Sequence, residues 1–381
     1  MSARTLIIDR IRGRGPISVA EFMSIALYHP EHGYYASVSK RTGRSGDFIT
    51  SVDIGPMFGA LLARQFSEMW RALESRAPSE SPEPRAESRI FDLVEAGAAN
   101  GQLARDVLDA AKEIDSEFYR SIRLHLIEAS MFARAMHRDT LGPHADLLVT
   151  SAGRLPDSVH GVIYANELLD ALPVHSVAMT DDGLRECYID VRGDELVERL
   201  GPPSTEALAR HLQSLGVSLQ PGSRAEINLA AMAWTTRACL SLHRGFLLLI
   251  DYGHPAAELY SPTHAAGTLT TYTRHVAEQR DTQGPPWLRD PGERDITSHV
   301  DLTAVQHVAE ALGCETLGML DQTYFLMSLL GTDPVDDLKQ RQALKALVMP
   351  GGLGSVQKVM IFAKDAGRPQ LRGLSGPARL T

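Results

Sequence analysis

Ile90-Phe-Asp-Leu-Val-Glu-Ala-Gly-Ala-Ala-Asn-Gly-Gln-Leu103 has the pattern of a buried strand that turns into a helix. The apolar run ends in the acid Glu95, and Gly97 and Gly101 then precede apolar residues at helical spacing. A parallel strand that passes through a glycine turn into a helix is the first half of a nucleotide-binding βαβ unit. The simpler alternative is that these glycines only allow a strand to pack closely against a helix.

A second acid indicates which kind of nucleotide this unit would bind. The second predicted strand, 122–127, is followed by Glu128, whose carboxylate can accept hydrogen bonds from both hydroxyls of a ribose. Dinucleotide sites typically contain G-x-G-x-x-G, because the backbone must approach a pyrophosphate at a helix N-terminus. Here the loop Gly97-Ala-Ala-Asn-Gly101 is poorer in glycine. S-adenosylmethionine carries no phosphate, so the spacing favours a methyltransferase over a dehydrogenase, with Glu95 ordering the loop around the amino acid end of the cofactor.

Composition limits the possible partners. The chain has 381 residues, 44% of them apolar, which is enough for a large core in one elaborated domain or two. A formal net charge of −9 argues against nucleic-acid binding, because no basic stripe is available to neutralise phosphates. No apolar run approaches the roughly 18 residues of a membrane-spanning helix. We therefore expect no nucleic acid and no membrane span, and the sequence leaves a homodimer open.

The cysteines and the N-terminus indicate a reducing compartment. Cys187, Cys239 and Cys314 are scattered without C-x-x-C spacing, which argues against a disulfide framework and a zinc site. We predict no metal site. The N-terminal residues continue directly into helical sequence, so we interpret them as a first helix and not as a targeting segment. The expected location is the cytoplasm.

The sequence of the whole chain predicts an α/β protein with a Rossmann-like, doubly wound sheet. Five core strands joined by crossover helices, followed by two final strands in sequence, predict the seven-stranded sheet of a class I methyltransferase that ends in an antiparallel hairpin. The expected parts are an N-terminal helical region with a linker (1–88), a first part of the core (89–173), an α+β insertion (174–228), a second part of the core (229–365) and a C-terminal tail (366–381).

The fourth strand delivers the most informative polar residues. Ligands of an open α/β sheet bind outside the carboxyl ends of the strands. The apolar run 162–165 is followed there by Asn166, Glu167 and Asp170. Asn166 alone could cap the next helix, and acids favour the positive helix N-terminus. Capping explains one polar residue but not three, so we predict that these side chains meet the methyl acceptor.

Weaker candidates follow the fifth strand and precede the last crossover helix. Asp251-Tyr252-Gly-His254 and His299 are candidates for substrate binding, although turn chemistry and helix capping explain them equally well. Solvated or core histidines remain the simpler interpretation for His175 and the rest. The polar loop from Gly46 and Asp47 to Ser51 joins two helices, and loops on rigid elements often carry function, so we expect it to cover the nucleoside.

Seven blocks of sequence, taken together, resemble the MidA-type methyltransferases, whose mitochondrial members are complex I assembly factors and protein arginine methyltransferases. The resemblance covers about 15–363 and is more specific than a lone glycine loop. The blocks are Gly33-Tyr-Tyr, Gly46-Asp-Phe-Ile-Thr-Ser, Val94-Glu-x-Gly, Asn166-Glu-Leu-Leu-Asp-Ala-Leu-Pro-Val174, Ile250-Asp-Tyr-Gly-His254, Gly267-Thr-Leu and Asp295-Ile-Thr-Ser-His-Val-Asp301.

The resemblance implies an S-adenosylmethionine-dependent enzyme that methylates arginine on a protein partner, in the manner of a respiratory-complex assembly factor. Glu167 and Asp170 would grip the guanidinium, and Asn166 would lie nearer the cofactor. The family loop usually has glycine where this chain has Ala99, and a methyl group there could crowd the cofactor or oppose a positive φ. A small-molecule methyltransferase, or a non-catalytic assembly factor that keeps the fold, are the alternatives.

Overall fold

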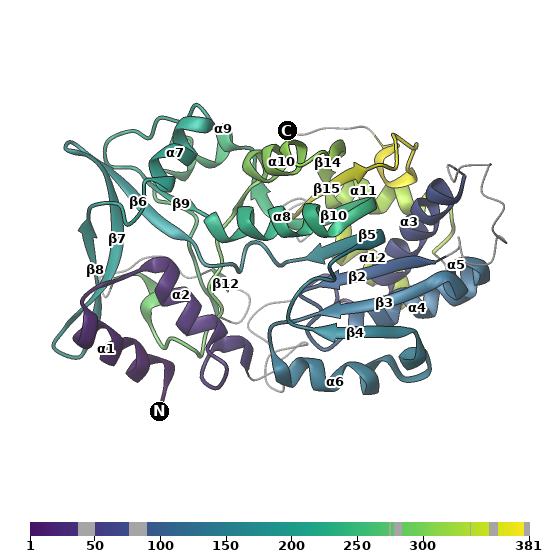
Figure 1. Ribbon diagram of the computed structural model, residues 1–381, viewed down its shortest axis with the longest axis horizontal. Coiled ribbons are helices and arrows are strands. Elements are labelled where there is room, and N and C mark those ends of the chain that lie inside the picture. The colour runs from purple at the N-terminus through teal and green to yellow at the C-terminus, as the bar shows by residue number, and fades with distance from the viewer. Residues whose placement is uncertain are drawn as a thin grey trace. The chain divides into compact units, whose positions relative to one another are not determined.

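The computed structural model describes residues 1–36, 50–75, 90–273, 276–277, 284–335, 337–349 and 357–376 (Figure 1). The chain forms two compact units, each built from three separate segments. Unit 1 comprises Met1–Phe48, Leu169–Trp234 and Tyr252–His307, and unit 2 comprises Ile49–Leu168, Thr235–Asp251 and Val308–Thr381.

Unit 2 contains a sheet of seven strands, which lie side by side in Figure 1 in the order β14-β15-β10-β5-β2-β3-β4. The pairs from β10 to β4 are parallel, whereas β14 and β15 are antiparallel. Numbered along the chain, this order is 3-2-1-4-5-7-6 from the β4 edge, which confirms the predicted fold class. The strands are β2 (Phe91–Ala96), β3 (Ile122–Ile127), β4 (Leu148–Ala152), β5 (Val159–Asn166), β10 (Leu242–His254, its last three residues in unit 1), β14 (Glu315–Asp321) and β15 (Gln357–Lys364).

The central strands approach one another closely because glycine lies at two contact points. A Cβ at Gly161 of β5 would overlap the Asp92 carbonyl of β2, and a Cβ at Gly245 of β10 would overlap the Gly161 carbonyl. The middle residues of both strands, 162–165 in β5 and 246–250 in β10, are apolar and buried, as expected for parallel strands covered on both faces.

Helix α3 (Met57–Glu74) lies within the range that we assigned to an N-terminal helical region, and it packs against α4 in unit 2. Its residues Phe58, Leu62 and Phe66 are fully buried in the same apolar cluster as the sheet. The other helices of this unit are α4 (Gln102–Ile114), α5 (Ser116–Ser121), α6 (Met131–Leu141), α11 (Gln322–Leu330) and α12 (Leu338–Val348); α8 (Leu229–Ser241) and α10 (Leu302–Ala311) contain unit boundaries.

Unit 1 contains an antiparallel sheet in the order β1-β7-β6-β9, with β8 paired to β7. Four of these strands and one helix lie in the 174–228 segment, which was predicted to contain both helix and strand. Ser18 begins α2 and its hydroxyl accepts the Glu21 N–H at 3.1 Å, as the sequence S-x-x-E predicts. The main elements are α1 (Ala3–Arg14), β1 (Ile17–Ser18), α2 (Val19–Tyr28), β6 (His175–Thr180), β7 (Gly183–Arg192), β8 (Glu195–Gly201), α7 (Ala207–Ser214), β9 (Arg224–Ile227), α9 (Ala256–Leu259) and the paired strands β11 (Tyr272–Thr273) and β12 (Val276–Ala277).

A short strand, β13 (Val300–Asp301), pairs in parallel with the last residues of β10 inside unit 1. Of the helices that the structure describes, none is long and apolar enough to cross a membrane.

Candidate cofactor and acceptor site

The loop after β2 is held against the end of β3 by its own backbone. The N–H groups of Gly97 and Ala98 donate to the Ile127 carbonyl at 2.8 and 3.1 Å. Gly97 and Gly101 have φ of +73° and +88°, and Ala99 also adopts a positive φ of +44°. The methyl group of Ala99 is thus compatible with the left-handed conformation, and both Gly97 and Ala99 are exposed. The loop presents its backbone to solvent at this point.

Glu128 fastens this loop from the end of β3. Its Oε2 accepts the Ala99 N–H at 3.0 Å, and its Oε1 accepts the Ser130 N–H at 2.8 Å. Burial raises the pKa of Glu128, although these hydrogen bonds favour the charged form. A carboxylate offers about four lone-pair directions, so Glu128 can still accept hydrogen bonds from hydroxyl groups.

His137 of α6 also holds this loop, through a contact that was not predicted from the sequence. Its Nε2 lies 2.9 Å from the Ala99 carbonyl oxygen, and its Nδ1 lies 2.9 Å from Ser151 Oγ. A carbonyl oxygen only accepts, so Nε2 carries the hydrogen. Burial lowers the pKa of His137, which keeps the ring neutral.

Glu95 lies beneath the loop and is buried. Tyr164 donates its hydroxyl to Glu95 Oε2 at 3.0 Å, and the backbone N–H of Ala104 also bonds to this carboxyl group. Burial raises the pKa of Glu95 to about 8 against these hydrogen bonds. Gly101 precedes helix α4 at the N-cap position and has no side chain to cap it, so Glu95 supplies a partner for the first turn from the neighbouring strand. The exposed backbone, the Glu128 acceptors and the absence of a G-x-G-x-x-G turn fit a nucleoside without a pyrophosphate.

The end of β5 forms a second polar group. Glu167 has a φ of +52°, an uncommon conformation for a residue with a side chain and one that clusters at functional sites. Its Oε1 accepts hydrogen bonds from Gln357 Nε2 at 2.8 Å, Asn166 Nδ2 at 3.2 Å and the Ser51 N–H at 3.3 Å. The backbone N–H of Glu167 donates to the Ile250 carbonyl of β10 at 2.9 Å. The carboxyl group is therefore fixed from three sides.

The second oxygen of Glu167 differs sharply from the first. Oε2 is buried and has no hydrogen-bond partner among the residues that the structure describes. Burial raises the pKa of Glu167 to about 7, against the three hydrogen bonds to Oε1, and the nearby charge of Asp251 raises it further. A buried polar atom normally has a partner, so this oxygen fits a group that brings an N–H donor or a positive charge.

Gln357 and Ser51 form hydrogen bonds to Glu167, and Gln322 forms one to Ser51. The sequence did not predict these supporting contacts. Ser51 Oγ lies 3.1 Å from Gln357 Oε1 and 3.4 Å from Gln322 Oε1, and all three side chains are fully buried. Gln322 and Gln357 are the first residues of α11 and β15. A polar residue at the start of an apolar element is a weak signal, and only the fold brings these distant positions together.

The other predicted residues are divided between the units. Asp251 in unit 2 accepts the Leu168 N–H at 3.1 Å, immediately after Glu167. Asp170 in unit 1 is buried near Tyr35, whose pKa is raised mainly by burial and then by the charges of Asp295, Tyr28 and Asp170. The predicted residues Gly46 and Asp47 lie outside the described residues.

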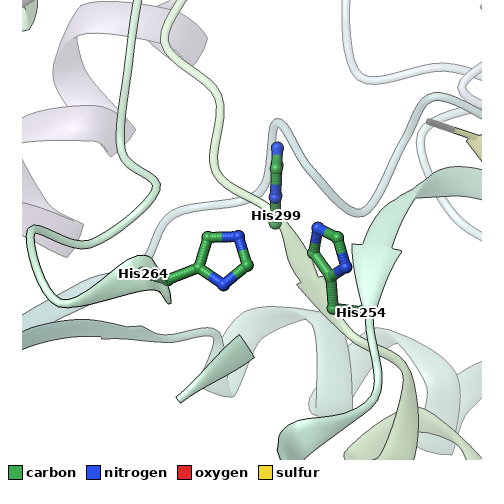
Figure 2. A group of neighbouring side chains, drawn as sticks. All are labelled: His254, His264 and His299. Atoms are coloured by element: carbon green, nitrogen blue, oxygen red, sulfur yellow. The ribbon is translucent and has the colours of Figure 1, made fainter. Parts of the chain in front are cut away.

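His254 and His299 come together in unit 1 with a third histidine, His264, which sequence reasoning left among the scattered ones. One ring nitrogen of each lies within 4.8 Å of the others, and Figure 2 shows the three rings facing a common point. Burial, with the neighbouring histidines, lowers the pKa of His299 to about 4. Tyr252, also predicted to bind substrate, lies half-buried on β10. We predicted no metal site, and this cluster was not foreseen.

The strand order, the loop after the first strand and the acid after the second define the class I fold of a methyltransferase that uses S-adenosylmethionine. The chain belongs to the family described as "Putative S-adenosyl-L-methionine-dependent methyltransferase", whose model matches residues 61–320. The family and the cofactor predicted from the sequence are confirmed.

Named relatives and a solved structure agree with this family. The chain is 30% identical over 370 residues to the mitochondrial protein arginine methyltransferase NDUFAF7 homolog of Drosophila melanogaster, covering 86% of this chain and 75% of that one. It is 28% identical to protein arginine methyltransferase NDUFAF7 of Rattus norvegicus, covering 94% and 79%. A Burkholderia thailandensis crystal structure with bound S-adenosyl-homocysteine has a TM-score of 0.83 and 27% identity, covering 98% and 95%.

Proposed function

We propose that this methyltransferase transfers a methyl group to an arginine side chain of a protein partner, with Glu167 as the residue that grips the guanidinium. The observation that carries the proposal is the Glu167 carboxyl group, of which Oε1 is held by three donors while the buried Oε2 has no partner among the described residues. A guanidinium presents paired N–H donors and a positive charge to such an oxygen. The names of the relatives support the same acceptor.

The cofactor supplies an already activated sulfonium methyl group, so the protein mainly aligns the acceptor and excludes water. The Gly97–Gly101 backbone and Glu128 would hold the nucleoside. Glu95 would order the loop, and Asn166 would lie near the cofactor. Glu167 would fix the plane of the guanidinium and receive the proton that its nitrogen releases on methylation. A carboxyl group with a pKa of about 7 is well matched to accept a proton near neutral pH.

Several predicted roles stay predictions within this proposal. They are acceptor binding by Asp170, substrate binding by Asp251, Tyr252, His254 and His299, cofactor binding by Gly46 and Asp47, the cytoplasmic location and the homodimer.

The test is to replace Glu167 by glutamine, which removes the charge and changes the shape little. We expect Glu167→Gln to change the dissociation constant for S-adenosylmethionine less than about threefold and to lower methyl transfer by about 10²–10⁴-fold, the usual contribution of a general base. Cell extract incubated with labelled cofactor and the protein, followed by mass spectrometry of peptides, gives the acceptor. Glu113→Gln, an exposed position on α4, is the matched control.

Label on arginine residues that disappears with Glu167→Gln supports the proposal. Label found only in small metabolites would favour the small-molecule methyltransferase instead. Full transfer to protein by the Glu167→Gln variant would remove Glu167 from the acceptor site. Cofactor binding without any labelled product would favour a non-catalytic assembly factor.

A further inference from the structure

We propose that His254, His264 and His299 form a binding site for a divalent transition-metal ion, and that Zn²⁺ is the ion it takes. Imidazole nitrogen suits Zn²⁺ and its neighbours in the first transition row. Three histidines with one open position are a common ligand set of zinc sites that keep a water molecule or substrate on the metal. The three side chains are only partly buried, which leaves room for such a fourth ligand.

The ligand atoms come from three segments of unit 1. His254 ends β10, His264 ends the short helix η4 (Pro262–His264), and His299 immediately precedes β13. The ring centroids are 4.8 Å apart for His254 and His264 and 5.0 Å apart for His254 and His299. With Zn–N bonds of about 2.0–2.1 Å, tetrahedral ligand nitrogens lie about 3.3 Å apart. The ligand nitrogens, which Figure 2 shows grouped around one point, lie within 4.8 Å of one another, so metal binding requires the rings to rotate until the nitrogens are closer.

One residue, Glu258 of α9, orients two of the rings. Its Oε1 lies 3.0 Å from His254 Nδ1, and its backbone carbonyl oxygen lies 3.0 Å from His264 Nδ1. Both oxygens accept, so each Nδ1 carries a hydrogen, and in the neutral tautomer the lone pair of each ring lies on Nε2. A ligating histidine almost always donates its other N–H to a carboxylate or carbonyl in this way.

The backbone that carries the third ring is held by Thr268. The N–H and hydroxyl of Thr268 donate to the buried carboxylate of Glu226 at 2.6 and 3.1 Å, and Thr268 Oγ1 accepts the backbone N–H of His299 at 3.1 Å. Gly267, at a φ of +79°, lets this loop approach Glu226, because a Cβ there would lie 2.5 Å from Glu226 Oε1. The loop that carries His264 is thereby fixed next to His299.

An unpaired ring nitrogen of His299 is independent evidence for a ligand at this point. Its Nδ1 is buried and has no hydrogen-bond partner among the described residues. Three rings that merely pack together would not explain why Glu258 directs two of them by their Nδ1 atoms. A cation bound at the point they face satisfies the arrangement.

The experiment measures metal binding and needs no methyl transfer. Metal-stripped protein is titrated with Zn²⁺ against a chromophoric chelator, and with Co²⁺ for its visible absorption. We expect one ion per chain and a Co²⁺ spectrum of tetrahedral intensity. His264→Ala should weaken binding at least 100-fold, and Glu258→Gln by about 10–100-fold, as for other partners of ligating histidines. His243→Ala is the matched control, because His243 is exposed and pairs with a single ring, that of His160, at 4.7 Å.

Equal affinity in the His264→Ala variant and the native protein would overturn the proposal, as would a loss of binding in His243→Ala alone. If His264→Ala does not fold, as judged by thermal unfolding, Glu258→Gln and the Co²⁺ spectrum of the native chain decide. A native chain that binds less than one Zn²⁺, or gives only an octahedral Co²⁺ spectrum, also excludes the site.

Discussion

The backbone N–H of Ala99 donates to Glu128 Oε2 over 3.0 Å, and this bond joins the loop after β2 to the acid after β3. The two features that first suggested a nucleoside site are therefore one physical assembly. Glu128 both shapes the loop and retains acceptor capacity for a ligand. A change at either residue should be felt at the other.

Replacing Glu128 by alanine should weaken S-adenosylmethionine binding by about 1.5–3 kcal/mol, the value of hydrogen bonds to a charged group. The variant also loses its bonds to Ala99 and Ser130, so loop order falls at the same time. Isothermal titration calorimetry measures the dissociation constant, with Glu113→Ala on α4 as the exposed control. An unchanged constant in Glu128→Ala would mean that the nucleoside binds elsewhere.

Replacing Ala99 by glycine should change little. Alanine in the left-handed region costs about 1 kcal/mol, while glycine loses a comparable amount of backbone entropy, about 0.5–1 kcal/mol. We expect the free energy of unfolding to move by less than about 0.5 kcal/mol and the cofactor constant by less than about threefold. Ala99→Val should instead lose about 1–3 kcal/mol, because a β-branched residue is strained at positive φ. A tenfold gain in affinity with glycine would show that the methyl group crowds the cofactor.

The buried Glu167 should make stability depend on pH. Its pKa is raised to about 7, so the fold favours the protonated acid, whereas an unfolded glutamic acid ionises near pH 4.5. Its contribution to stability is present below about pH 4.5 and is lost as the pH rises through about 7. The Glu167→Gln variant cannot ionise at this position. Its free energy of unfolding, relative to that of the native protein, should therefore increase by roughly 1–3 kcal/mol as the pH rises from about 4.5 to about 7. Urea unfolding at several pH values measures this gap, and a gap that does not change with pH would contradict the prediction.

Replacing Gly161 by alanine should destabilise the sheet strongly. The added Cβ would overlap the Asp92 carbonyl on the neighbouring strand, and neither backbone can move without breaking the ladder. We expect a loss of at least about 4 kcal/mol or failure to fold. Gly193→Ala is the control, since its φ is also positive at +65° but nothing lies near the new Cβ. Chemical denaturation measures the free energy of unfolding of both variants. Similar losses of stability would show that the positive φ, and not the overlap with the Asp92 carbonyl, causes the destabilisation.

The central strands were predictable because their middle residues are apolar runs, as at 162–165 and 246–250. The positions of Glu95, Glu128 and Glu167 were predictable for a related reason, since an acid at the end of a parallel strand falls at the carboxyl edge of the sheet. Gln322 and Gln357 could not be found, because only the fold brings both glutamines onto the Ser51 hydroxyl and Gln357 onto the Glu167 carboxylate.

The histidine cluster was also beyond sequence reasoning. His254 and His264 are ten positions apart and His299 lies further on, with no spacing that matches a known metal motif. Their approach depends on a loop docked on Glu226 and on β13 pairing with β10. Helix α3 was assigned to the N-terminal region because it precedes the linker in the sequence. Its packing against α4 cannot be inferred from that order.

The last strand of the sheet along the chain, β15, pairs with both β10 and β14 and so occupies an interior position. During synthesis, the backbone edge of β10 stays open until 357–364 have left the ribosome, and such an edge is a template for pairing with other chains. Gln357, which donates to Glu167, arrives in the same step. A nascent chain therefore gains protection from aggregation and the Gln357 hydrogen bond to Glu167 at once, and prematurely terminated chains have neither.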